Sequence, residues 1–285
     1  MRENWKRSAV LSPPIPPARR FQLVISYYGP AHYGWQRQDS ESVEDRSVQS
    51  FLEKAIFKIS GERSNAYGSG RTDSGVHALG QCAHFDSSCL RMDEETLRRA
   101  LNANLPETIR INGVTERFDA FHARFSTLLR EYEYVLKDDV HWTPFDNGRA
   151  WRLRNLPDIS TLNEMQKFLI GEDVDFRAFD FTKSNDGHSQ KRDVLKSRFE
   201  RRGDSLVFTI TGNAFLYHMV RAIVGMSVSL ALKHDRKDAV SMFSGLMRPE
   251  LGIKADFIAP AQGLYLKRVI YDEEEYLKFR SAMKE

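Results

Sequence analysis

The sequence predicts an α+β protein built from two similar α/β halves around an extended antiparallel sheet with a central cleft. Segments with strand and helix patterns alternate from Arg20 onward, and their order repeats in the second half of the chain. The chain has 285 residues, of which 41% are hydrophobic, enough for one large core or two smaller ones. Functional sites in such proteins often lie in a cleft between units. We place the boundary between the halves near residue 140.

The first half is predicted to contain strands and two helices. The strand segments are rich in β-branched and aromatic residues and end at turn residues such as Gly29-Pro30. Ser47 is placed to cap the first helix and Gly61 to stop it, and Pro106 marks the end of the second. The predicted strands are residues 21–27, 80–86, 109–115, 123–127 and 130–136, and the predicted helices are residues 48–59 and 93–105.

The second half repeats this order with different residues. It follows an irregular stretch around residues 142–147. Its first helix is closed by Gly171, and two of its strands are joined by the turn Arg202-Gly203-Asp204. The predicted strands are residues 149–153, 194–201, 206–211 and 264–270, and the predicted helices are residues 160–170, 215–233 and a charged segment from residue 273.

Residues 1–18 are predicted to form a flexible proline-rich tail. Their only apolar run, Ala9-Val10-Leu11, is too short for the core of a signal peptide. The run Pro13-Pro14-Ile15-Pro16-Pro17 that follows favours a semi-extended segment. The two halves are then residues 19–140, which carry the glycine-rich loop described below, and residues 141–285.

Charge, cysteine content and hydropathy argue against several classes of protein. The 42 basic and 39 acidic residues nearly balance, so any contact with a polyanion depends on where the charges lie. Cys82 and Cys89 are too few for a disulfide framework, and with His77 and His84 they match no familiar metal site. The longest uncharged stretch elsewhere, residues 205–220, suits a strand and a turn. We therefore expect a cytoplasmic protein with no metal and no membrane segment.

The most informative motif is the run from Gly68 to His77, in which glycines surround an adjacent cation, hydroxyl and carboxylate. Glycine lets a ligand or another backbone come close, so this loop can present Arg71 and Asp73 against a planar or phosphorylated group. The run lacks the third glycine of a dinucleotide fingerprint, and the chain has no Gly-Lys-Ser/Thr phosphate loop. A turn that only caps the next strand is the competing interpretation.

Three further segments combine aromatic and charged residues. They are residues 118–125 with His122 and Arg124, residues 130–134 with Tyr132 and Tyr134 on one strand face, and residues 213–221, which enter a helix carrying Arg221. Taken singly, paired tyrosines are usually packing residues, and a helix arginine usually reaches solvent or an acid. Their occurrence together with the glycine-rich run favours a functional interpretation.

Together with Gly70-Arg71-Thr72-Asp73-Ser74-Gly75-Val76-His77, these segments resemble the TruA family of tRNA pseudouridine synthases. The resemblance spans about residues 21–270. It includes Tyr33-Gly34-Trp35-Gln36 near the start and Gly263-Leu264-Tyr265-Leu266 near the end. Ser69 and Ser74 stand where alanine is common in the family, a small-for-small change that should leave the loop intact.

The resemblance implies a site and a substrate. It implies that Asp73 is the catalytic aspartate, Tyr132 the active-site tyrosine and Arg221 the arginine associated with the aspartate. Arg71 is a candidate for contact with the RNA backbone. The family resemblance further implies a homodimer that converts uridines of the tRNA anticodon stem-loop, at positions 38–40, without a cofactor.

The chemistry of uridine isomerisation suits these residue types. The reaction breaks the C1′–N1 bond, turns the ring and rejoins it through C5, and an ionised carboxylate such as Asp73 can act as nucleophile or base. A nearby guanidinium such as Arg221 would favour the ionised form. The target base must be extruded from the stem, and Tyr132 offers a ring to support it and a hydroxyl for proton transfer. Whether Asp73 attacks the sugar or the base stays open.

Arginines beside aromatic or histidine side chains are expected to contact phosphates next to stacking surfaces. Arg71, Arg124, His122 and Trp35 are the substrate-binding residues that we expect. The wider set is Arg19, Arg20, Arg37, Arg124, Arg149, Arg152 and Arg154 with Tyr33, Trp35, His122 and Trp151. Any single arginine has an equally ordinary explanation as part of a solvated surface.

Two other functions remain as alternatives. A catalytically silent tRNA-binding protein of the same fold would use the basic residues alone, although Asp73, Tyr132 and Arg221 are all present. A hydrolase would pair Asp73 with a second carboxylate, and no motif identifies one.

Overall fold

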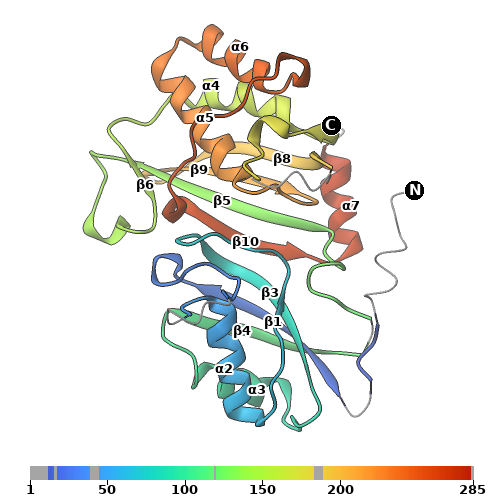
Figure 1. Cartoon of the computed structure of the whole chain (residues 1–285). Helices are drawn as coiled ribbons and strands as arrows, with labels where there is room; N and C mark the ends of the chain where they lie inside the picture. The colour runs from blue at the N-terminus through green and yellow to red at the C-terminus, as the bar shows by residue number, and fades with distance from the viewer. Residues whose placement is uncertain (1–11, 16–17, 39–44, 119, 183–188, 284–285) are drawn as a thin grey trace. The chain divides into compact units, whose positions relative to one another are not determined.

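The computed structural model describes residues 12–15, 18–38, 45–118, 120–182 and 189–283. The chain divides into two compact units (Figure 1). The first is Met1–Thr127 with Leu266–Tyr271, and the second is Leu128–Tyr265 with Asp272–Glu285. The division after Thr127 lies before the position near residue 140 that the sequence suggested. Most of the predicted proline-rich tail, residues 1–11 and 16–17, lies outside the described residues.

The first unit is a sheet covered by two helices. Its strands lie in the order β4-β1-β3-β10, with β2 beside β3, and β1 pairs antiparallel with both β3 and β4. The helices α2 and α3 lie together on one face of these strands (Figure 1). The elements are β1 (Arg19–Tyr27), α2 (Val48–Ser60), β2 (Tyr67–Gly68), β3 (His77–Ser87), α3 (Glu94–Asn102), β4 (Ile109–Arg117) and β10 (Leu264–Ile270).

Strand β1 shows why this layer forms. Phe21, Leu23 and Ile25 alternate along the strand and are fully buried, whereas Val24 between them is 38% exposed. Successive side chains of a strand point to opposite faces, so this alternation gives one covered and one open face. Leu52 and Ile56 of α2 are also fully buried, and their helical spacing places them on one helix face. The core of the first unit therefore combines one strand face with one helix face.

The second unit has a sheet in the order β5-β9-β8-β7, with β6 parallel to β5. The pairs β5–β9, β8–β9 and β7–β8 are antiparallel. Helix α5 is buried along most of its length because it contacts both α4 and α6 (Figure 1). The elements are β5 (Leu129–Asp138), β6 (Trp151–Leu153), α4 (Ile159–Gln166), β7 (Gly171–Asp175), β8 (Lys191–Arg202), β9 (Ser205–Gly212), α5 (Met219–Lys233), α6 (Arg236–Leu246) and α7 (Glu273–Ala282).

The predicted α+β class, with its mostly antiparallel strands, is confirmed. The Ser47 side chain accepts a hydrogen bond from the Ser50 backbone nitrogen, and Gly61 ends α2 in the left-handed conformation with φ 70°. Both ends of this helix therefore lie where the sequence predicted. Asp93 likewise caps α3. No helix in the described part of the chain is both long and apolar enough to cross a lipid bilayer.

Two element predictions were wrong. Residues 123–127 form a turn instead of a strand, because the Ser126 nitrogen donates to the His122 carbonyl and the Thr127 hydroxyl donates to the Ala123 carbonyl. The helix predicted from residue 215 begins only at Met219, since His218 has φ 61°, which a right-handed helix does not allow. Helix α6 and strands β2 and β7 had not been predicted from the sequence.

We expect the substitution Gly225→Ala to destabilise the protein. A Cβ added at this position of α5 would lie 2.7 Å from the Phe257 carbonyl oxygen and 2.9 Å from the Ala259 nitrogen. Overpacking of this kind costs about 1–3 kcal/mol of unfolding free energy, more than the helix propensity of alanine returns.

The matched control is Gly245→Ala in α6, where the nearest atom would be a side-chain carbon of Ile253 at 3.6 Å. This variant should gain up to about 1 kcal/mol from helix propensity. Urea denaturation of both variants measures the difference. Equal stabilisation by the two substitutions would contradict the close approach at Gly225.

Candidate active site

The glycine-rich run forms a tightly held loop between β2 and β3 of the first unit. The Val76 nitrogen donates to the Asp73 carbonyl (3.1 Å) across the Ser74–Gly75 turn. The Thr72 carbonyl accepts from the Trp35 nitrogen (3.1 Å), and the Thr72 hydroxyl lies 2.7 Å from the Tyr27 hydroxyl. Asp73 thus has its backbone fixed on both sides by hydrogen bonds.

A second segment, residues 33–36, holds this loop in place. Gly34 has φ 88°, and a Cβ there would lie 2.4 Å from the Thr72 carbonyl oxygen, so only glycine fits. The Val48 nitrogen donates to the Gly34 carbonyl and the Gln49 nitrogen to the Trp35 carbonyl, both at 3.0 Å. The first turn of α2 therefore uses N–H groups that have no partner within the helix to anchor the segment beside Asp73.

Trp35, an expected substrate-binding residue, is only 2% exposed. Its ring lies so close to the Gly68 backbone that a Cβ at Gly68 would be 2.5 Å from it. In this position the ring supports the glycine-rich loop from inside.

Arg71 lies on the exposed side of the same loop, two residues before Asp73. Its Nε donates to the Gln36 side-chain oxygen (3.2 Å), and the Gln36 amide donates in turn to the Gln49 side-chain oxygen (3.0 Å). These contacts orient a permanently charged guanidinium at the surface next to Asp73.

His122 and Arg124 lie near the beginning of the glycine-rich run, where β2 pairs with β3. The His122 ring centroid lies 4.5 Å from that of His84 and 5.7 Å from that of Tyr67, and its Nδ1 accepts from the Arg124 nitrogen (3.1 Å). His84 lies seven positions after His77, where β3 begins at the end of the loop, which is roughly 20 Å along the strand. His122 and Arg124 therefore lie beside the part of β3 remote from the strand's first residue.

The two histidines of this cluster are uncharged at neutral pH. Burial lowers the pKa of His84 to about 3, and burial followed by the charges of Arg20 and Arg124 lowers the pKa of His122. Arg124 itself is exposed, with its guanidinium carbon 5.8 Å from the Phe125 ring centroid. Of the pair that the sequence suggested, Arg124 is the one that can offer a charge to a phosphate.

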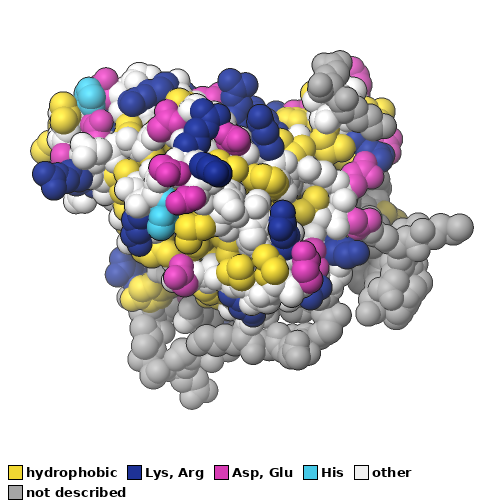
Figure 2. Space-filling view, turned by 90° about the horizontal axis from the view of Figure 1, so that it is seen from above, with side chains coloured by type: hydrophobic (Ala, Val, Ile, Leu, Met, Phe, Trp, Pro, Cys, Tyr) yellow, Lys and Arg dark blue, Asp and Glu magenta, His cyan; other side chains and the backbone are white. Residues whose placement is uncertain are grey.

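Several of the other candidate arginines form ion pairs. Arg20 is 7% exposed and binds Asp86, with nitrogen to oxygen distances of 2.7 and 2.8 Å. The remaining pairs are Arg19 with Glu116, Arg37 with Glu53 and Arg152 with Asp139. Figure 2 shows Lys and Arg side chains interspersed with Asp and Glu on the face that it presents. Ion pairs with acidic neighbours thus account for these four arginines without any contact with RNA.

In the second unit, Tyr132 lies on β5 opposite Ile210 of β9. It is 7% exposed, and its ring meets the Phe215 ring edge to face, with centroids 5.1 Å apart. Tyr134 follows on the same strand face and differs in its environment. Its hydroxyl donates to the Pro260 carbonyl (2.7 Å), and burial raises its pKa well above the ordinary value. The positive charge of Arg221 acts in the opposite direction.

Arg221 is fixed to the backbone of a neighbouring segment. Its Nε donates to the Ala259 carbonyl (2.9 Å), and the Ala259 nitrogen donates to the Arg221 carbonyl (3.0 Å). Gly225 lies one turn later in α5, and its lack of a Cβ lets residues 257–259 approach the helix closely enough for this pairing. The close approach of residues 257–259 to α5 therefore fixes the position of the Arg221 side chain.

A network that the sequence analysis did not identify holds the segment between Tyr132 and Arg221. Asn213 and Asp193 bind each other through three hydrogen bonds, including Asn213 Nδ2 to Asp193 Oδ2 at 2.7 Å. The Asp173 nitrogen donates to Asp193 Oδ1, and Arg130 donates to the Asn213 carbonyl. This network fixes the start of the loop that carries Phe215. Asn213 belongs to the segment 213–221 that the sequence singled out, but no pattern in the residues around Asp193 indicated a role for it.

The structure thus places Asp73, Arg71 and Trp35 around one loop of the first unit, with His122 beside Tyr67, the residue that precedes this loop, and Arg124 next to His122. Tyr132 and Arg221 belong to the second unit. The Phe215 ring contacts Tyr132, and the loop that carries Phe215 leads into the helix that carries Arg221. Within the described residues, no group of three or more His, Cys, Asp or Glu side chains is placed to hold a metal ion.

The chain is similar in sequence to known proteins over most of its length. A family model described as tRNA pseudouridine synthase matches residues 23–126 and 166–272. The tRNA pseudouridine synthase A of Brachyspira hyodysenteriae is 37% identical over 254 residues, which are 89% of this chain and 98% of that protein. That of Treponema denticola is 39% identical, covering 88% and 92%, and that of Methylacidiphilum infernorum is 37% identical, covering 90% and 96%. Because the family model matches most of the chain and these relatives align over nearly their full lengths, the chain belongs to the tRNA pseudouridine synthase family.

Proposed function

We propose that this protein isomerises uridine to pseudouridine in tRNA, at positions 38–40 of the anticodon stem-loop. The observation that carries the proposal is the fixed loop around Asp73, where Gly34, Trp35 and Tyr27 hold Thr72 by backbone and side-chain contacts. The family to which the chain belongs supports the same activity. As the family resemblance implies, the enzyme acts as a cytoplasmic homodimer without a cofactor.

Asp73 is proposed as the catalytic carboxylate. It attacks the target nucleoside and bonds to it, the C1′–N1 bond breaks, and the uracil ring turns so that C5 bonds to C1′. The bond to Asp73 breaks again, which releases the carboxylate for the next turnover. The proton on C5 is then removed and N1 gains a proton, so the product is an isomer of the substrate. A loop with fixed backbone holds the carboxylate ready without rearrangement at each turnover.

Arg221 and Tyr132 are proposed to assist this step. The Arg221 guanidinium is permanently charged and favours the ionised form of the carboxylate with which the family associates it. Tyr132 supports the extruded base with its ring and transfers the C5 proton through its hydroxyl.

Arg71 and Arg124 are proposed to contact RNA phosphates, because both are exposed and charged. For Trp35 and His122 we propose a supporting role, since both side chains are at least nine-tenths buried.

The competing function is a tRNA-binding protein without catalysis. One assay separates the two: incubation with tRNA that lacks the modification, followed by mapping of pseudouridine along the sequence. Pseudouridine at positions 38–40 supports the proposal, whereas tight binding without any pseudouridine supports the silent protein.

We expect Asp73→Asn to abolish pseudouridine formation, because the substitution keeps the size of the side chain and removes its charge. The folded variant should keep much of its tRNA affinity. Single-turnover assays and a filter-binding titration measure both properties. The control is Asp204→Asn, in the exposed turn between β8 and β9, which should keep full activity. Turnover by a folded Asp73→Asn protein would remove Asp73 from the catalytic role.

Tyr132→Phe keeps the ring and removes the hydroxyl. If the hydroxyl transfers the C5 proton, the single-turnover rate should fall by about 10²-fold or more, the usual scale for acid–base groups. The control is Tyr134→Phe on the same strand face, which loses one hydrogen bond to Pro260 and about 1 kcal/mol of stability. A near-normal rate for Tyr132→Phe would assign the residue to ring contact alone.

The pair Asn213 and Asp193 allows a reversible test of how the Phe215 loop is positioned. Asn213→Asp alone brings two carboxylates together and should lower the single-turnover rate by roughly tenfold or more, since small displacements of catalytic groups are costly. Adding Asp193→Asn restores the donors and acceptors of the side-chain hydrogen bonds described above, with the amide now at position 193, and should restore the rate. Failure of the double variant to recover, with its stability restored, would contradict this positioning role.

A further inference from the structure

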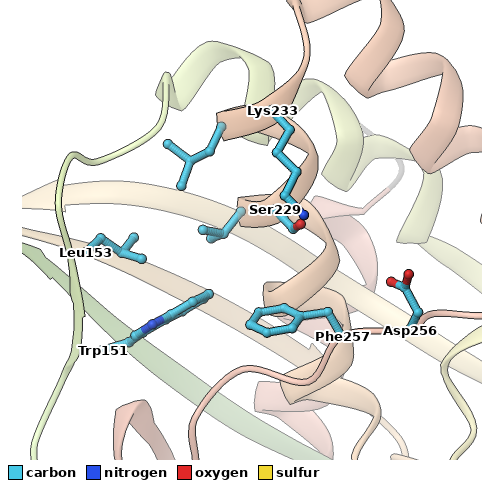
Figure 3. Close-up of a pocket in the computed structure, with 8 residues that line it drawn as sticks. Trp151, Leu153, Ser229, Lys233, Asp256 and Phe257 are labelled. Carbon is cyan, nitrogen blue, oxygen red and sulfur yellow. The ribbon is translucent and has the colours of Figure 1, made fainter.

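A pocket of about 350 Å³ lies in the second unit, between the end of α5, β6 and the segment around residue 257 (Figure 3). Of the residues that the sequence suggested for RNA contact, Trp151 alone lines it, and none of the residues assigned under the proposed function does. Its volume lies at the lower end of the range typical of small-molecule sites, so it suits a single nucleotide or a compound of similar size.

The floor of this pocket is aromatic. The rings of Trp151 and Phe257 lie next to each other, with centroids 5.8 Å apart and planes tilted by 39°. Phe257 is 40% exposed and Leu232 beside the pocket is 48% exposed, so apolar surface faces solvent here. An exposed apolar surface inside a hollow indicates a binding site more than a random surface residue does.

Both rings are held by the protein itself. On its other side, Trp151 meets the Tyr134 ring edge to face at 6.2 Å. The backbone of Phe257 lies against Gly225 of α5, where a Cβ would be 2.7 Å from its carbonyl oxygen. A planar ligand therefore finds a floor that is already formed, which lowers the entropy cost of binding.

Two oppositely charged side chains stand at the edges of the floor. In Figure 3 the Lys233 chain runs along α5 toward Ser229, and the Asp256 carboxylate stands beside Phe257. Among the residues that the structure describes, neither of these two charged groups takes part in a hydrogen bond or an ion pair. The pocket thus offers an aromatic floor, a cation and a hydrogen-bond acceptor without a partner.

These features complement the face of a nucleotide's base, its phosphate and the hydrogen-bonding edge of its base. A base stacks on aromatic side chains, a lysine binds phosphate, and a carboxylate accepts hydrogen bonds from base N–H groups. Guanine presents two adjacent donors on one edge, N1–H and the N2 amino group, which match the two oxygens of a carboxylate. We propose that this pocket binds an unpaired guanine nucleotide of the tRNA substrate, with Asp256 reading the base and Lys233 the phosphate.

Free nucleotides test the pocket without any need for catalysis. Equilibrium dialysis should show GMP binding roughly tenfold or more tighter than UMP, because only guanine uses both carboxylate oxygens. Asp256→Asn should remove this preference. Lys233→Gln should weaken GMP while leaving guanosine, which lacks the phosphate, unchanged. The control is Lys237→Gln on α6, an exposed lysine that does not line the pocket. GMP binding that equals UMP binding, or that neither pocket variant alters, would overturn the proposal.

Kinetics on whole tRNA distinguish this inference from the proposed function on which it rests. Asp256→Asn and Lys233→Gln should each raise the KM for tRNA at least about threefold, and Lys237→Gln should not. Unchanged KM values in an active enzyme would overturn the RNA occupant while leaving the proposed function intact. A protein that binds GMP as expected but forms no pseudouridine would instead contradict the proposed function.

Discussion

The first unit depends on one close approach between two backbones. Gly34 and Trp35 lie against Thr72, and the approach is possible only because Gly34 takes a left-handed conformation and carries no Cβ. The N-terminal turn of α2 reaches the same segment through two of its backbone N–H groups. The backbone of this loop is therefore positioned by contacts with residues 33–36, and that segment is in turn anchored by α2.

In the second unit, a close approach of two backbones at a glycine positions a side chain of a helix instead of a loop. Arg221 is anchored by the backbone of Ala259, and Gly225 provides the space that brings that backbone close. The same approach sets the position of Phe257 at the floor of the pocket near the end of α5. A single small residue in α5 therefore influences both the position of Arg221 and the pocket near the end of the helix.

Sequence patterns predicted those features whose causes lie within a few residues. The caps of α2 at Ser47 and Gly61 and the turn between β8 and β9 belong to this group, because capping and turn geometry depend on local side chains. The resemblance of several ordered motifs supplied the candidate site and the family. Asp193 gave no signal, since its partner Asn213 lies twenty residues later and the two meet only when β8 and β9 pair.

The burial of Trp35 could not be predicted for a similar reason. A tryptophan in a polar motif is as compatible with RNA stacking as with packing, and the choice depends on what lies opposite. Here the Gly68 backbone, more than thirty residues later in the chain, lies against the ring. Helix α6 was missed although Asp235 caps it well, because it directly follows α5 with no glycine or proline between them.

The position of β10 has a consequence for the order in which the protein matures. The strand is encoded near the end of the chain, yet its residues 266–270 belong to the first unit, and Tyr271 donates its hydroxyl to the Ala123 carbonyl. Val269 and Tyr271 also cover the buried cluster of Cys82, Phe121 and Ala123. During synthesis on the ribosome, the unit that carries the glycine-rich loop must wait for almost the whole polypeptide before this cluster is covered. The half that is translated first is thus completed last.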